Sequence, residues 1–144
     1  MKEFDYIIIG GGCAGLSLAY ELEINGRLKE KKLAIIETRK EYKRDKTWSF
    51  WKMFEHNFQD CVIKSWNNFS INTLEGFHEL INRSFPYQSI NSGKFYKKIN
   101  SKLSLNPNVS FLKSLDNVSS KNSLIFNSVF KDKLDKTKLW QHFQ

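Results

Sequence analysis

The sequence has few of the residues that build disulfide-rich or metal-binding proteins. Its 144 residues include two cysteines, Cys13 and Cys61, too few for a disulfide framework or a cysteine-rich metal site. The three histidines, His56, His78 and His142, are widely separated, and no H-E-x-x-H motif occurs. We therefore expect no metal site, and the low cysteine content favours a reducing, cytoplasmic compartment.

The sequence also lacks a run that would span a membrane. The uncharged run from Tyr6 to Tyr20 has 15 residues and includes three successive glycines, whereas a membrane helix needs roughly 20 apolar residues. Because Lys2, Glu3 and Asp5 provide no net positive flank, the run is also a poor signal peptide. No internal repeat or low-complexity linker is present. These absences predict a soluble or peripheral protein.

Composition indicates a globular chain. Hydrophobic residues make up 40% and aromatic residues 15%, enough for the core of one modest domain. The net charge of +8 comes from 23 basic and 15 acidic residues, and only the stretch Arg39–Lys46 is densely basic. Nucleic-acid binders concentrate such charge on one surface, so we expect a solvated basic surface and no nucleic acid. The alternative is a surface that docks on anionic lipid at the inner face of the cell membrane.

The first 37 residues contain the most informative pattern. An apolar run at Tyr6–Ile9 leads into G-x-G-x-x-G, which begins at Gly10, and an uncharged, helix-compatible segment follows. A second apolar run at Leu33–Ile36 then ends in Glu37, 22 positions after the last motif glycine. A dinucleotide-binding fingerprint places an acid about 20 positions after its glycines. The order strand, turn, helix, strand, carboxylate therefore predicts a bound dinucleotide.

Each part of the fingerprint has a separate expected role. Gly10 permits the sharp turn, Gly12 leaves room for a pyrophosphate, and Gly15 lets the helix lie close to the sheet. The helix that begins near Cys13 offers backbone N–H groups to the phosphates, and Glu37 bonds a ribose hydroxyl. The residues expected to bind the cofactor are Gly10, Gly11, Gly12, Cys13, Ala14, Gly15 and Glu37.

Other residues of this region have structural expectations. Leu18 and Leu22 share one helix face and are expected to point to the sheet, with Ala19 small enough for close packing. We interpret Cys13 as a buried filler rather than a nucleophile.

The basic pair after Glu37 bears on which dinucleotide is bound. Arg39 and Lys40 are placed to attract a 2′-phosphate. The carboxylate of Glu37 opposes such a group, so we expect the adenosine of FAD rather than that of NADP.

We divide the chain into residues 1–40 as a dinucleotide-binding β-α-β unit, residues 41–60 as a loop with an aromatic motif, and residues 61–144 as the start of a substrate domain. Alternation from Cys61 to Ile81 predicts an antiparallel ribbon, and Ser92–Leu105 reads as a helix with Ser92 as N-cap. Short β-like runs follow at 109–112 and 124–130. Because this later β material does not alternate with helices, we expect it not to complete the parallel sheet. The fold class is thus α/β: the N-terminal part of a Rossmann-like FAD/NAD(P)-binding fold with an additional antiparallel β region.

Four segments carry a resemblance to a known family. They are Asp5–Ala19 (DYIIIGGGCAGLSLA), Asp45–Trp51 (DKTWSFW), Tyr87–Tyr96 and Gln141–Phe143. Together they resemble the lycopene cyclase family of bacterial carotenoid enzymes, whose members carry D-R-T-W-x-F-W after the second strand. Lys46 stands where the family favours Arg, which removes the planar fork needed for a bidentate contact.

The resemblance implies a two-domain flavoprotein that closes the linear ends of lycopene into β-ionone rings. This non-redox isomerisation, an intramolecular lyase reaction, needs reduced FAD, with NADPH as the reductant. In the family an acidic side chain protonates the polyene end, and the electron-rich flavin stabilises the carbocation. The motif that bears this acid lies downstream of Gln141–Phe143, so no catalytic residue is assigned. We expect the chain to be the front part of a family member and to be inactive as a cyclase alone.

The aromatic segment supplies candidates for substrate or flavin contact. Trp48 and Trp51, with Phe50, are candidates to wall a polyene channel or to lie near the flavin, although aromatics at such spacing also form cores. Asp45 either caps the following segment or orients a ligand. Two other functions stay open: another FAD-dependent oxidoreductase, of the hydroxylase or prenyl reductase type, and a non-catalytic remnant that binds nucleotide or membrane. The aromatic segment argues against the first, and the missing acid favours the second for the isolated chain.

Overall fold

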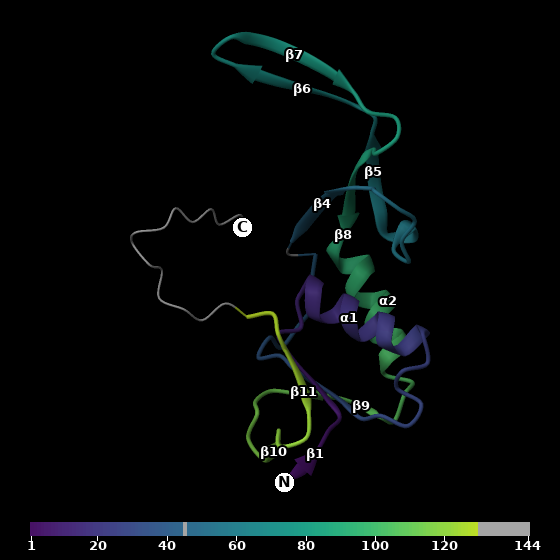
Figure 1. Cartoon of the computed structure of the whole chain (residues 1–144), viewed down its shortest axis with the longest axis vertical. Coiled ribbons are helices and arrows are strands. Elements are labelled where there is room, and N and C mark those ends of the chain that lie inside the picture. The colour runs from purple at the N-terminus through teal and green to yellow at the C-terminus, as the bar shows by residue number, and fades with distance from the viewer. Residues whose placement is uncertain (45, 130–144) are drawn as a thin grey trace. The chain divides into compact units, whose positions relative to one another are not determined.

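The computed structural model describes residues 1–44 and 46–129, which belong to two compact units (Figure 1). One unit contains residues 1–41 and the chain from residue 98 onward, and the other contains residues 42–97. The structure thus divides the chain differently from the three consecutive parts expected from the sequence. The difference arises because residues 42–97 interrupt a unit whose two halves pair through its sheet.

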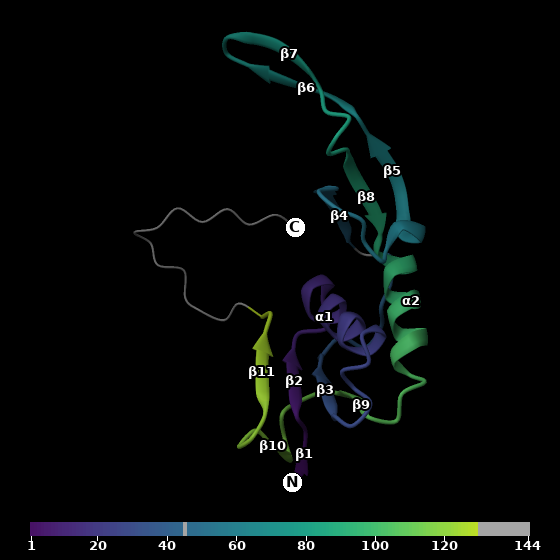
Figure 2. The same cartoon turned by 45° about the vertical axis from the view of Figure 1, so that its right-hand side comes forward.

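The first unit is built on a parallel sheet of four strands in the order β11-β2-β3-β9 (Figures 1 and 2). The strands are β2 (Tyr6–Ile9), β3 (Leu33–Ile36), β9 (Val109–Leu112) and β11 (Leu124–Asn127). The helix α1 (Cys13–Ile24) connects β2 to β3, and a short parallel pair joins β1 (Lys2–Glu3) to β10 (Val118–Ser119). This mixed α/β architecture is compatible with a nucleotide-binding fold.

The two central strands are buried along most of their length. All four residues of β3 and the middle of β2 are buried, which matches the continuous apolar runs typical of parallel strands covered on both faces. The core of the unit includes a cluster of four buried side chains with three partly buried ones packed against it: Phe4, Ile7, Ala34 and Ile36, with Ile9, Leu112 and Val118. A strand that is buried on both faces is apolar along its whole length, so it appears in the sequence as a continuous apolar run. The sequence therefore predicted both β2 and β3.

The expectation that the later β runs would not complete the parallel sheet was wrong. β9 pairs with β3 and β11 pairs with β2, both in parallel. Neighbours in a sheet need not be neighbours in sequence, and here the crossover from β3 to β9 contains the whole second unit.

The buried face of α1 also differs from the expectation. Gly15, Leu16 and Ala19 are the buried residues of this helix, whereas Leu18 and Leu22 are only half-buried. The glycine and the alanine face the strands because a helix that approaches a sheet closely has room there only for small side chains. The buried residues of α1 thus combine two small side chains with one large apolar side chain, Leu16.

The second unit contains an antiparallel sheet of three strands in the order β4-β8-β5. The strands are β4 (Thr47–Trp51), β5 (Val62–Trp66) and β8 (Tyr87–Asn91), and the 3-10 turn η1 (Gln59–Cys61) precedes β5. A separate hairpin pairs β6 (Asn68–Thr73) with β7 (Gly76–Ile81). The hairpin confirms part of the expected antiparallel ribbon, but β5 pairs with β8 instead. The aromatic motif expected as a loop is the strand β4.

The predicted helix near residue 92 is confirmed as α2 (Ser92–Leu103). Its predicted apolar stripe, Phe95, Ile99 and Leu103, is fully buried. The N-cap differs from the prediction: the Asn91 side chain accepts a hydrogen bond from the Lys94 N–H at 3.0 Å. Ser92 instead accepts a hydrogen bond from the backbone N–H of Lys46 at 3.3 Å. The side chain one position before the predicted residue therefore caps α2, while the Ser92 hydroxyl is bonded to Lys46.

Candidate functional site

The first motif glycine shapes the turn at the carboxyl end of β2. Gly10 has φ +103°, in the region that favours glycine, and its N–H donates to the Ile36 carbonyl at 2.9 Å. A Cβ on Gly10 would lie 2.4 Å from Ser128 Oγ, just beyond β11. The turn is therefore held between the ends of both strands that flank β2.

The other two motif glycines meet opposite steric conditions. A Cβ on Gly15 would lie 2.0 Å from the carbonyl oxygen of Gly10 and 2.9 Å from Cγ2 of Ile8. A Cβ on Gly12 would meet no described atom within 4 Å, and its φ of −84° suits any residue. Packing within the described residues thus requires Gly15, whereas the space beside Gly12 is open to another molecule.

The first turn of α1 contains no acidic side chain of its own. Gly12 is the N-cap of this helix and provides no side-chain cap. The first N–H groups of a helix have no intrahelical acceptors, and the helix dipole makes this end positive. Burial raises the pKa of the Cys13 thiol, although a hydrogen bond with Ser17 acts in the opposite direction. Cys13 is half-buried rather than fully buried as expected, and the raised pKa disfavours the thiolate, the form that would act as a nucleophile.

Glu37 lies beside the glycine turn, at the carboxyl end of β3. Its Oε2 accepts a hydrogen bond from the Gly11 N–H at 2.9 Å, and its Oε1 accepts one from the Arg39 N–H at 2.8 Å. The Arg39 guanidinium lies 3.5 Å from Oε2. A carboxylate offers about four acceptor positions, so two N–H donors leave positions open on both oxygens. The structure therefore brings the predicted acid to the predicted turn.

Ser128 is a member of this site that the sequence did not reveal. Its Oγ lies 3.0 Å from the Ile9 carbonyl and 3.2 Å from the Gly10 carbonyl, and donates toward both. Its N–H also donates to Ile9 at 2.8 Å. It follows β11, 118 positions after Gly10, and no motif marks it. Only the pairing of β11 with β2 brings the hydroxyl to the turn.

The two tryptophans of the aromatic segment lie on opposite faces of β4. Trp48 packs edge-on against Phe95 and Tyr96 of α2, with ring centroids 5.1 and 5.4 Å away. Trp51 is 41% exposed and packs beside Phe69 and Tyr87 instead. Side chains alternate between the two faces along a strand, so residues an odd number of positions apart, such as Trp48 and Trp51, lie on opposite faces. Trp48 is thus half-buried against α2 and has a packing role, and Trp51 remains available for a ligand.

The remaining candidates at the start of this segment are placed only in part. Asp45 and the segment Gln141–Phe143 lie outside the described residues. Lys46 is exposed, and the contact that the structure gives it is the one from its backbone N–H to Ser92. That contact would form equally with arginine, so it does not depend on the difference from the family pattern.

Comparison with known families identifies the chain. Residues 5–127 match the family described as "Lycopene cyclase protein". The chain belongs to the lycopene cyclase family. The match includes the glycine turn, Glu37, the aromatic strand β4 and Tyr87–Tyr96, so three of the four segments that resemble the family fall within it, whereas Gln141–Phe143 lies beyond it. No curated protein matches the chain.

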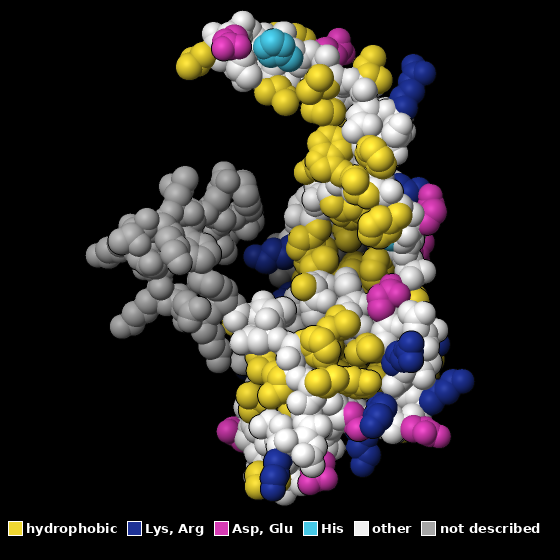
Figure 3. All heavy atoms as spheres, viewed as in Figure 1, with side chains coloured by type: hydrophobic (Ala, Val, Ile, Leu, Met, Phe, Trp, Pro, Cys, Tyr) yellow, Lys and Arg dark blue, Asp and Glu magenta, His cyan; other side chains and the backbone are white. Residues whose placement is uncertain are grey.

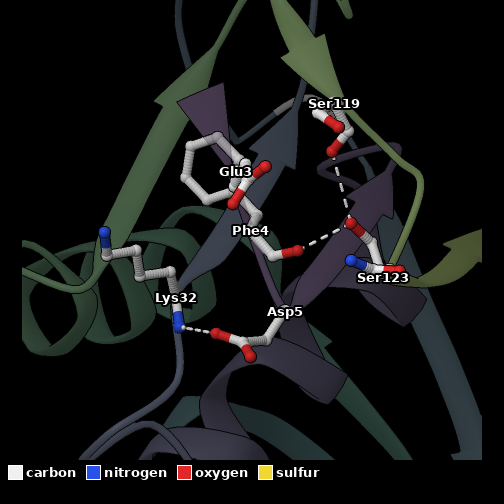
Figure 4. Close-up of a pocket in the computed structure, with 7 residues that line it drawn as sticks. Glu3, Phe4, Asp5, Lys32, Ser119 and Ser123 are labelled. Carbon is white, nitrogen blue, oxygen red and sulfur yellow. Dashed lines mark hydrogen bonds between the residues drawn. The ribbon is translucent and has the colours of Figure 1, made fainter. Parts of the chain in front are cut away.

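Figure 4 shows the residues that line another cavity of this lycopene cyclase family member, none of which belongs to the glycine turn. It has a volume of about 330 Å³ and is lined by residues that precede the strands β2, β3 and β11, among them Asp5, Lys32 and Ser123. Asp5 accepts hydrogen bonds from the Lys31 Nζ and the Lys32 N–H, both at 2.8 Å, and Ser123 donates to the Phe4 carbonyl at 2.6 Å. Open α/β sheets bind ligands at the carboxyl ends of their strands. This cavity is at the amino ends, with these polar groups already paired, so we assign the site to the glycine turn.

Two further observations concern other site types. Within residues 1–44 and 46–129, no group of three or more His, Cys, Asp or Glu side chains is arranged to hold a metal ion. None of the described helices is both long and apolar enough to cross a membrane.

Proposed function

We propose that this chain supplies the dinucleotide-binding part of an FAD-dependent lycopene cyclase, which closes the linear ends of lycopene into β-ionone rings. The observation that carries the proposal is the family match over residues 5–127, which spans the glycine turn and the aromatic strand together. The substrate class is a carotenoid, and contact with a membrane surface follows from the low solubility of such a substrate in water.

The residues at the glycine turn fit the ADP part of FAD. The space beside Gly12 suits a pyrophosphate, which the N–H groups at the amino end of α1 would bind. The strand order β9-β3-β2-β11 corresponds to the first four strands of a doubly wound dinucleotide fold. In that fold the ligand binds where the order reverses, which here is beside the ends of β2 and β11.

Glu37 supports FAD rather than NADP as the resident dinucleotide. Its remaining acceptor positions suit the two ribose hydroxyls of an adenosine. A 2′-phosphate would instead face this carboxylate, and the guanidinium of Arg39 already lies 3.5 Å from it. NADPH then takes part as a diffusing reductant.

The expected chemistry assigns limited roles to this chain. When bound, reduced FAD supplies an electron-rich ring next to a carbon centre that becomes positively charged during ring closure. The described residues bind and orient the cofactor through its ADP part. No residue of the chain is assigned as the acid that protonates the polyene.

Titration with FAD and with ADP tests the cofactor part of the proposal. Isothermal calorimetry should detect competition between the two ligands, because they share the adenosine site. Gly12→Val should weaken both by tenfold or more while leaving the fold intact, since the added atoms enter open space. Gly76→Ala, at the first residue of β7, is a control for backbone strain away from the site: a Cβ there also meets no described atom, but φ is +132°, and ADP affinity should stay unchanged. Equal affinity of the native chain and Gly12→Val would refute the cofactor assignment.

A chimera tests the catalytic part. Residues 1–127 would replace the matching segment of a characterised lycopene cyclase, and the product would be expressed in lycopene-accumulating bacteria. We expect cyclic carotenoids on chromatography, and none from the chimera that carries Gly12→Val. A soluble chimera that binds FAD but leaves lycopene unchanged would refute the assignment as a cyclase.

A further inference from the structure

Three aromatic side chains form a row across the sheet of the second unit. Trp51 on β4 and Trp66 on β5 both pair with Tyr87 on the central strand β8. Residues directly opposite one another in a sheet point to the same side, and the ring centroids lie 4.9 Å and 6.2 Å from that of Tyr87. Phe69 of β6 adds a fourth ring, 5.0 Å from Trp51.

These rings surround an open apolar pocket. Its volume is about 390 Å³, and it is lined by Trp51, Trp66, Asn68, Phe69 and Tyr87. The polar groups of this lining include the Asn68 amide and the Tyr87 hydroxyl, and no lining residue is charged, although Lys64 Nζ lies 5.6 Å from the centroid of the Trp66 ring. Figure 3 shows hydrophobic side chains gathered over the region of β4, β5 and β8. The pocket is within the range of about 300–1,000 Å³ that small-molecule sites occupy.

The row is separate from the core of its unit. Trp48 and Ile90, on the opposite face of the same sheet, are half-buried and buried, and Trp48 packs on α2. Trp51 keeps 41% of its surface exposed. An exposed aromatic surface that the core does not use is typical of a ligand site.

The apolar surface continues from the pocket along the β6–β7 hairpin. Phe69 pairs with Leu80, and Ile71 lies two residues further along the same face of β6, where it pairs with the exposed His78. Ile71 and Leu80 are 46% and 42% exposed. The pocket and this face together suit a long, narrow and uncharged molecule rather than a compact polar one.

We propose that this aromatic pocket binds one end of a linear polyene, with the chain of the ligand lying along the apolar face of the hairpin. The choice of a polyene rests on the proposed function, because a carotenoid is an uncharged conjugated hydrocarbon. Flat conjugated chains pack well against aromatic rings, and the lining offers no charge that would favour a polar ligand. The rings of this row thus select the ligand by shape and polarity.

Binding of all-trans-retinol, a fluorescent conjugated isoprenoid, tests this inference on the 144-residue chain without FAD. We expect a saturable rise in retinol fluorescence that linear geranylgeraniol reverses by competition. Trp51→Ala and Phe69→Ala should each raise the Kd at least fivefold. Asn68→Arg, a change at an exposed residue, should do the same by introducing a charge into the pocket.

Phe77→Ala is the matched control. Phe77 is an exposed aromatic residue of the same hairpin, but it pairs with Asn72 and so lies on the face opposite Phe69. The Kd of the Phe77→Ala variant for retinol should stay within twofold of the native value. Circular dichroism would establish that each variant is folded. Three results would overturn the inference: no binding of retinol, unchanged binding by all the pocket variants, or displacement of retinol by cellohexaose. If one of these results occurred while FAD still bound, the proposed function would stand and only this inference would fail. If FAD did not bind but retinol did, only the cofactor proposal would be affected.

Discussion

Substitution of Gly15 by alanine offers a direct test of the close approach between α1 and the sheet. Gly15 is buried in the first turns of α1. The added Cβ would lie 2.0 Å from the Gly10 carbonyl oxygen, a backbone atom of the turn. Because a backbone oxygen cannot rotate away as a flexible side chain would, either α1 or the turn must shift by about 1 Å to restore a normal contact.

The expected loss of stability follows from two opposing effects. Alanine favours a helix over glycine by about 1 kcal/mol, while overpacking costs typically about 1–3 kcal/mol and occasionally more. The overlap with both Gly10 and Ile8 favours the upper end of this range. We therefore expect a net destabilisation of about 2 kcal/mol, or a decrease in Tm of roughly 4–8 °C for a chain of this size.

Urea unfolding followed by circular dichroism would measure this change. Gly12→Ala is the matched control, since its Cβ enters open space and its φ suits alanine. Because alanine is a poorer N-cap than glycine, we expect Gly12→Ala to lose no more than about 1 kcal/mol, less than Gly15→Ala. A Gly15→Ala protein as stable as the native one would show that the helix does not approach the turn as closely as described.

Three further predictions concern individual side chains. Glu37→Lys should weaken ADP binding by roughly 1–3 kcal/mol through a lost charged hydrogen bond, and Glu37→Gln should weaken it less; equal affinities by calorimetry would contradict this role. The hydrogen bond from Lys31 lowers the pKa of Asp5, so this carboxylate stabilises the fold above its ordinary pKa of about 4, and the contribution is lost as pH falls through the lowered value. The Tm of the native chain should then fall more than that of Asp5→Asn between about pH 5 and pH 2, and parallel curves would argue against it. Burial raises the pKa of the Cys13 thiol, so iodoacetamide at neutral pH should label it far more slowly than in urea; rapid labelling of the native chain would contradict its neutral, packed state.

The local sequence was sufficient to predict the β-α-β unit. The apolar runs of β2 and β3, the three glycines and Glu37 lie within the first 37 residues, and short-range geometry orders them. The helix α2 was equally readable, because Phe95, Ile99 and Leu103 recur at helical spacing. In these segments hydrophobic periodicity and the steric needs of glycine act over a few residues, so the sequence contains the whole signal.

Long-range pairing decided what the sequence left open. β9 and β11 carry no mark that assigns them to the parallel sheet, and only their registers with β3 and β2 bring Ser128 to Gly10. The same holds in the second unit, where pairing across β8 joins Trp51, Tyr87 and Trp66 on one face while Trp48 faces α2. The sequence by itself determined that a glycine turn and an aromatic segment exist, but it did not show that this segment is the strand β4. Only the tertiary structure decided which side chains surround each of them, because sheet partners are selected by burial and hydrogen bonding over the whole chain rather than by their neighbours in sequence.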